Sequence, residues 1–196
     1  MHAMWRRLRG GMLLLVLVGG GCAPTFEPEI PVLRATPPRP FDAWPADPPD
    51  NPTTPAKVAL GWQLFYDPRL SGNGRLACVD CHRPELAFGG PDAVSFGVGG
   101  TRSRRHSPSL VNAGYWAMHF WDGRAPDLES QARAVLVEPS EMAIEPAELE
   151  RRLAASPGYR SPFGAVFGVE RPGVEEVARA LAAFERRLVS GGSDWD

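Results

Sequence analysis

The stretch RLACVDCHRPELAFGG, residues 75–90, carries two cysteines three positions apart and a histidine directly after the second. On a helix, Cys78 and Cys81 lie on one face, and His82, four positions after Cys78, shares that face. Two thiols in this arrangement can form thioether bonds to haem vinyl groups while the imidazole binds the iron. We therefore predict one covalently bound haem c, with His82 as an iron ligand.

Two other kinds of site use a pair of cysteines at this spacing. A thioredoxin-like redox pair follows a strand in a βαβ unit, and no run of this sequence shows sustained strand alternation. A structural zinc site needs four ligands, and the sequence contains only one further cysteine, Cys22. Both alternatives therefore fit the sequence less well than haem attachment.

Residues 1–21 combine a basic start with an apolar run that is too short to span a bilayer, which is typical of an export signal. The run ends in GGGC, so we expect cleavage before Cys22 and a periplasmic protein anchored through a lipid on that cysteine. Cleavage without acylation and a retained anchor are the alternatives. Export agrees with covalent haem attachment, which bacteria normally carry out in the periplasm.

The remaining sequence predicts a Pro-rich linker over residues 22–55 and one mostly α domain with long loops over residues 56–196. Residues 24–55 contain eleven prolines, so this segment is a tether, which we expect to be largely disordered, or a strap lying on its neighbour. The formal charge of −2 and the ordinary fractions of charged and apolar residues give no indication of nucleic-acid binding.

Capping residues and apolar periodicity predict the helices. The first begins after Thr54, with Pro55 at its first position, and ends before Asp67-Pro68. A short helix covers the haem motif, and residues 84–101 are a loop. The other predicted helices span residues 107–117, 126–137, 145–156 and 173–190.

The ligand on the other side of the iron separates two functions. A strong ligand there is typical of an electron-transfer cytochrome, whereas an open position allows oxygen or peroxide to bind. The candidate ligands downstream of the haem motif are His106, Met118, His119 and Met142. The residues alone leave this choice open.

Four segments resemble the bacterial dihaem cytochrome c peroxidase family, including its branch that matures tryptophan tryptophylquinone. They are LGWQLFYDPRLSGNGRLACVDCHRPELAFGG (60–90), SFGVGG (95–100), RHSPSLVNAGYWAMHFWDGRAPDLESQ (105–131) and EPSEM (138–142). The resemblance covers about residues 57–190. It implies a cytochrome c-like helical domain that reduces hydrogen peroxide with electrons from a donor such as a small cytochrome or a cupredoxin.

The resemblance also implies roles for individual residues. Gln131 and Glu141 match the glutamine and the glutamate over the peroxide site, where an amide can hold peroxide and a carboxylate can move its proton. Trp121 matches a tryptophan on the proposed electron route between two haems, and Arg105 matches an arginine that can meet a haem propionate. Trp121 and Tyr115 are also candidates for carrying a radical.

Three departures from the family pattern change the expectations. Val98 stands where classical members have a histidine that ligates the resting iron, so we expect an open sixth position. His106 stands where many members have a calcium-binding asparagine, which makes an inter-haem calcium doubtful. The sequence has no second haem motif. It is therefore a one-haem enzyme relying on a second haem-bearing chain, a fragment of a dihaem peroxidase, or a mono-haem electron-transfer cytochrome.

Overall fold

The computed structural model describes residues 35–194. Its α-helices are α1 (Pro55–Phe65), α2 (Cys78–Cys81), α3 (Leu128–Val137), α4 (Pro146–Ala154), α5 (Pro157–Phe167) and α6 (Val174–Glu185). Four 3-10 helices are η1 (Pro68–Leu70), η2 (Pro84–Leu86), η3 (Val98–Gly100) and η4 (Ala113–Tyr115). Over these residues the only β-pairing is three isolated bridges, which confirms the mostly α class. The predicted export signal and Cys22 lie outside the described residues.

The helices α1 and α3 each begin directly after a residue whose side chain caps them. Thr54 accepts a hydrogen bond from the N–H of Lys57 at the start of α1, with Pro55 at the first helical position. Asp127 accepts from the N–H of Ser130 at the start of α3. The described residues include no helix with the length and apolar character that a membrane crossing requires.

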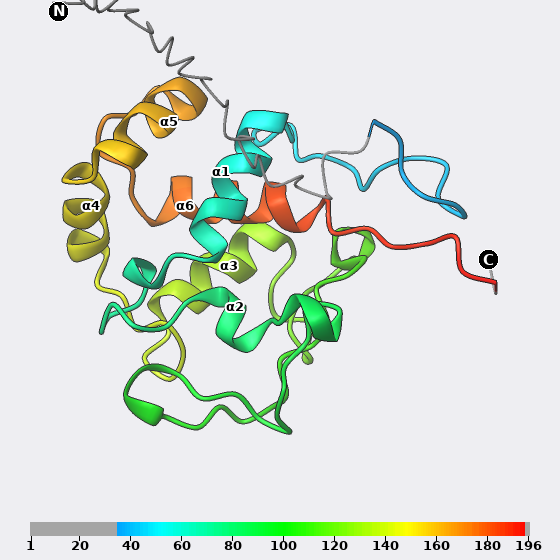
Figure 1. Cartoon of the computed structure of the whole chain (residues 1–196), viewed down its shortest axis with the longest axis horizontal. Coiled ribbons are helices and arrows are strands. Elements are labelled where there is room, and N and C mark those ends of the chain that lie inside the picture. Colours follow the sequence, from blue (N-terminus) through cyan, green and yellow to red (C-terminus); the bar gives the residue numbers. More distant parts are fainter. Residues whose placement is uncertain (1–34, 195–196) are drawn as a thin grey trace, which may run out of the picture.

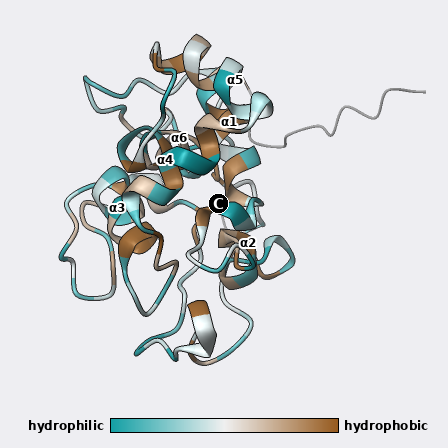
Figure 2. Cartoon of the chain, turned by 90° about the vertical axis from the view of Figure 1, so that its left-hand side faces the viewer, coloured by the Kyte–Doolittle hydropathy of each residue, from teal (hydrophilic) through white to brown (hydrophobic). Residues whose placement is uncertain are grey.

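The core forms where α1 and α3 both pack against α6 (Figure 1). Phe65 of α1 and Phe184 of α6 are buried, with their ring centroids 5.2 Å apart. Gly61 allows the two helices to approach, because a Cβ atom there would overlap the carbonyl oxygen of Ala180. The outward face of α4 is largely hydrophilic, with apolar segments of α1 and α6 behind it (Figure 2).

The predicted helix over residues 107–117 is wrong, since only η4 forms there. Tertiary hydrogen bonds hold this backbone in another conformation. The N–H of Leu110 donates to the carbonyl oxygen of Phe88, and the N–H of Asn112 donates to that of Leu188. Asn112 has a left-handed φ of 63°, which an α-helix does not accommodate.

The helix α5 has no counterpart among the predicted helices. It contains Pro162 in its interior together with Gly158 and Gly164, three residues that lower helix propensity. Burial of Tyr159 and Phe163 against the core stabilises it despite this composition. Tertiary packing here overrides local preference.

Part of the Pro-rich segment lies on the helical domain. The ring of Phe41 stacks on Tyr115 with centroids 4.3 Å apart, and the hydroxyl of Tyr115 donates to the carbonyl oxygen of Ala43 at 2.7 Å. Arg187 lies over the ring of Trp44, with its guanidinium carbon 4.2 Å from the ring centroid. Residues 41–45 therefore form a strap on the domain rather than a disordered tether, while residues 22–34 lie outside the described range.

Candidate haem site

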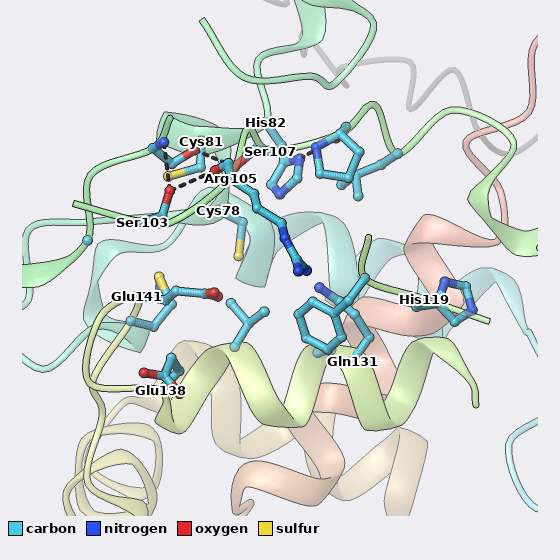
Figure 3. Close-up of a pocket in the computed structure, with 18 of the residues that line it drawn as sticks. Cys78, Cys81, His82, Ser103, Arg105, Ser107, His119, Gln131, Glu138 and Glu141 are labelled. Atoms are coloured by element: carbon cyan, nitrogen blue, oxygen red, sulfur yellow. Dashed lines mark hydrogen bonds between the residues drawn. The ribbon is translucent and has the colours of Figure 1, made fainter. Parts of the chain in front are cut away.

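A cavity of about 540 Å³ lies between the haem motif and α3. In Figure 3, Cys78, Cys81 and His82 stand on one side of it, and Gln131 and Glu141 stand on the other. Apolar side chains complete much of the lining: Phe65, Leu76, Leu110, Leu128, Val135, Leu136 and Leu181. The structure thus brings the cysteine and histidine side chains of the motif to the same space as the two residues that the resemblance indicates.

The motif itself forms a single helical turn. Asp80 accepts a hydrogen bond from the N–H of Ala77 at 2.8 Å, which caps α2, and the N–H of His82 donates to the carbonyl oxygen of Cys78. Cys78 and Cys81 are not joined by a disulfide. Burial raises the pKa of both thiols, so both cysteines are protonated at neutral pH.

Two backbone carbonyl groups fix the ring of His82. Its Nδ1 lies 3.0 Å from the carbonyl oxygen of Phe88 and 3.1 Å from that of Pro108. Carbonyl oxygens only accept, so Nδ1 carries the proton and Nε2 keeps its lone pair for a metal. Ala87 and Phe88 both have left-handed φ values, 53° and 56°, which turn the Phe88 carbonyl group toward the ring. Burial lowers the pKa of His82 and favours the neutral form that binds iron.

These residues fit a haem c. Two free thiols and an imidazole with an available nitrogen surround an apolar cavity whose volume is typical of a cofactor site. Arg104 and Arg105 lie at the lining and supply the positive charge that carboxylate groups of a cofactor need. Arg105 also forms an ion pair with Asp122 at 2.9 Å.

Gln131 and Glu141 reach the cavity from α3 and from the loop that follows it. Gln131 lies on α3, and its side chain points toward the side that carries the haem motif (Figure 3). Burial raises the pKa of Glu141, and the neighbouring Glu138 raises it further, while Arg124 opposes the shift. A carboxyl group with a raised pKa both accepts and returns a proton more readily near neutral pH.

The candidate ligands for the second side of the iron divide into two groups. Met142 and His119 are buried and contribute to the lining, and His106 also lines the cavity with its Nδ1 2.8 Å from the carbonyl oxygen of Asp92. Met118 is 61% exposed and lies outside the lining, as does Val98. The structure therefore does not bring Met118 to the site.

Trp121 stands at the mouth of the cavity. It is 62% exposed, and its indole N–H donates to the carbonyl oxygen of His106 at 2.8 Å. This hydrogen bond fixes the ring while leaving much of its surface accessible. Tyr115 lies apart from the lining, under the strap.

Glu185, a buried carboxyl group that lines the cavity from α6, is not among the residues that the sequence predicts at the site. Its Oε2 has no hydrogen-bond partner within the described residues, and burial raises its pKa to about 8. The sequence feature that indicates Glu185 is its position four residues after Leu181, on the face of α6 that turns toward the core. A charged residue on such a face is unusual and marks a special environment.

Comparisons with known proteins agree with this site. The family model described as di-haem cytochrome c peroxidase matches residues 55–196. A methylamine utilization protein MauG from Methylorubrum extorquens is 43% identical over 147 residues, which make up 74% of this chain and 42% of the relative. A cytochrome c551 peroxidase from Nitrosomonas europaea is 36% identical over 148 residues, covering 74% of this chain and 44% of the relative.

The fold comparison gives the same answer. The crystal structure of a MauG-like protein associated with microbial copper homeostasis has a TM-score of 0.72 and 35% sequence identity, covering 77% of this chain and 45% of that one. The chain thus spans less than half the length of these relatives. Family model, relatives and fold together show that the chain belongs to the di-haem cytochrome c peroxidase family.

Proposed function

We propose that this chain forms the peroxide-reacting haem c domain of an exported peroxidase. The observation that carries the proposal is the opposed placement of His82 and the pair Gln131 and Glu141 across one cavity (Figure 3). An electron carrier needs no proton-transferring carboxyl group over its haem. The position of the half-buried Glu141 in the lining of that cavity therefore favours an enzyme.

The side chains around the cavity have different roles in the reaction with peroxide. A haem c held by Cys78, Cys81 and His82 would supply the redox-active iron. Glu141 takes a proton from hydrogen peroxide and returns it to the departing oxygen, while the amide of Gln131 holds the substrate by hydrogen bonding. One peroxide, two protons and two electrons yield two waters, so the balance requires two electrons from outside this domain.

The position opposite His82 is proposed to be open. Val98, at the place of the resting ligand in classical relatives, has no ligating atom and does not line the cavity. His106 is the competing ligand, because the hydrogen bond of its Nδ1 to the carbonyl oxygen of Asp92 leaves Nε2 free for a metal, and the EPR measurement below separates the two states. Open coordination would let peroxide bind without prior reduction of a second haem.

The electrons are proposed to come from a small cytochrome or a cupredoxin, through a second haem carried by another segment or another chain. The exposed face of Trp121 supports a route at this side of the cavity, with Trp121 or Tyr115 as a radical site. Periplasmic export and a lipid anchor on Cys22 remain proposals from the sequence, since the residues concerned lie outside the described range.

The test uses the haem-loaded chain and the variant Glu141→Gln. We expect a high-spin ferric EPR signal that disappears within seconds of adding stoichiometric peroxide, and a loss of about 100-fold or more in that rate when Glu141 is replaced. Glu145→Gln serves as the control, because Glu145 is an exposed glutamate at the start of α4 whose side chain caps nothing. A low-spin signal that ignores peroxide would instead indicate a strong ligand and an electron carrier.

A further inference from the structure

A close backbone contact joins the segment after the haem motif to the loop that carries Glu141. Gly97 lies against this loop, where a Cβ atom would overlap the carbonyl oxygen of Ser140 and come within 2.8 Å of the Cα of Glu141. The next residue, Val98, donates its N–H to the carbonyl oxygen of Glu141 at 2.8 Å. Two backbones approach this closely only where one of them carries no side chain.

A second contact of the same kind comes from the segment before the haem motif. Gly72 donates its N–H to the carbonyl oxygen of Met142 at 2.7 Å, and a Cβ atom on Gly72 would overlap the carbonyl oxygen of Ala143. Arg152 of α4 anchors this segment by donating to the carbonyl oxygens of Ser71 and Gly72. The loop that carries Glu141 is thus held by both flanks of the haem motif.

Space, rather than an unusual backbone conformation, explains both glycines. Gly97 has a φ of −87°, which any residue adopts, and Gly72 also lacks a left-handed φ. A side chain at either position would displace the loop backbone. An alanine substitution at either glycine therefore tests the close contact with the loop and does not test the conformational freedom of glycine.

We infer that Gly97 is a positioning residue for Glu141, whose carboxyl group it places in the cavity by its contact with the backbone of residues 140–141. The inference rests on the proposed function of Glu141. Glu141 stands on a loop and not on a helix, so neighbouring segments must supply the precision that a proton-transferring group needs. Gly97 and Gly72 supply it from two sides.

The test is a double-mutant cycle between Gly97→Ala and Glu141→Ala in the haem-loaded chain, and the measured quantity is the fluoride affinity of the ferric protein. Fluoride probes the cavity without turnover and accepts a hydrogen bond from a protonated carboxyl group. We expect Gly97→Ala to change the affinity about five- to tenfold when Glu141 is present, the worth of one hydrogen bond. In the Glu141→Ala background we expect less than about a twofold change, because no side chain at position 141 then donates a hydrogen bond to fluoride.

Gly173→Ala is a matched control. Gly173 has φ −105° and ψ −166°, close to the φ −87° and ψ −166° of Gly97, and a Cβ atom there would meet only the flexible Oε2 of Glu176 at 3.6 Å. We expect no change in fluoride affinity from this variant. Equal changes from Gly97→Ala in both backgrounds, or no change in either, would overturn the inference.

Val98→Pro keeps the inference testable if Gly97→Ala does not fold. Val98 begins η3, where proline is tolerated, and the substitution removes the N–H that donates to Glu141. The same coupling to Glu141→Ala is expected, and additive effects would count against the positioning role. Unchanged peroxide consumption in Glu141→Gln would reject the proposed catalytic role alone, since the fluoride cycle decides positioning independently.

Discussion

The two halves of this molecule are held together in different ways. In the half built from α1, α3 and α6, large side chains such as Leu64, Phe65 and Phe184 are at most 1% exposed and form a continuous core. In the half that carries the haem motif, backbone hydrogen bonds between distant loops dominate, such as those from Gly72 to Met142 and from Gly90 to Ser107. Apolar side chains of both halves, such as Leu76 and Leu181, line the cavity between them, so a bound cofactor would join the two halves.

The largest effect is expected from breaking the close approach in the helical half. In Gly61→Ala, the new methyl group would overlap the carbonyl oxygen of Ala180 and lie 2.8 Å from the Cβ of Phe184. Because α1 and α6 would have to separate, we expect a loss of about 3 kcal/mol or more in the free energy of unfolding. A decrease in the melting temperature of the haem-loaded protein measures this loss of stability.

Gly164→Ala is the control for this substitution. Gly164 also lies in a helix, α5, but a Cβ atom there would be 3.9 Å from its nearest neighbour, the carbonyl oxygen of Val169. Replacing glycine by alanine in such a position favours the helix by about 1 kcal/mol. Equal melting temperatures for the two variants would show that α1 and α6 can separate without loss.

The same difference explains what the sequence could predict. Helices α1, α3, α4 and α6 have an apolar period and α1 and α3 have capping side chains, both local signals, and all four form as expected. Residues 107–117 carry the same local signals, Ser107 and Pro108 included, yet form no α-helix. Their backbone hydrogen-bonds to Phe88 and Leu188, residues distant in sequence that no local pattern identifies.

The residues of the site also differ in whether a local sequence pattern predicts them. The spacing of Cys78, Cys81 and His82 predicts haem attachment without any knowledge of the fold. Gln131 and Glu141 have no local signal of their own and were found only through resemblance, while the structure adds that both face the motif. The carbonyl groups that fix His82 were beyond prediction, because they depend on two left-handed residues without glycine at 87–88.

An intermediate effect is expected where the two halves meet, at Glu185. Its pKa is raised from 4.5 to about 8, first by burial and then by Glu129, against the opposing charge of Arg186. Between these values the folded protein binds a proton that the unfolded chain has lost. The contribution of Glu185 to the free energy of unfolding is therefore fully present below about pH 4.5 and is lost as the pH rises through 8. The loss is at most about 1.4 kcal/mol per pH unit.

Glu185→Gln removes this titration while keeping the shape of the side chain. We expect the free energy of unfolding of the variant, relative to the original protein, to rise steadily from pH 5 to pH 8. Denaturant unfolding of the haem-loaded protein at several pH values measures this difference. If the free energy of unfolding changed with pH in the same way for both proteins, the bound cofactor or a rearrangement of α6 would have to give Glu185 a partner.

The smallest effect is expected at the strap formed by residues 41–45. Tyr115→Phe removes the hydroxyl that donates to the carbonyl oxygen of Ala43 but keeps the ring that stacks on Phe41. We expect a loss of about 1 kcal/mol or less, together with faster proteolysis at the strap. Tyr66→Phe is the control, since Tyr66 is 39% exposed and its hydroxyl makes no hydrogen bond within residues 35–194.

The contacts of the strap differ from those in both halves, because a Pro-rich segment packs on the surface of the domain. Prolines around residues 38–45 restrict the unfolded chain, so each contact of the strap has less conformational entropy to overcome than it would in a flexible segment. One hydrogen bond, one stacked pair and the contact of Arg187 with the ring of Trp44 can then hold it. If Tyr115→Phe left the rate of proteolysis unchanged, the stacking of Phe41 would suffice for docking, and Phe41→Ala would have to release the strap.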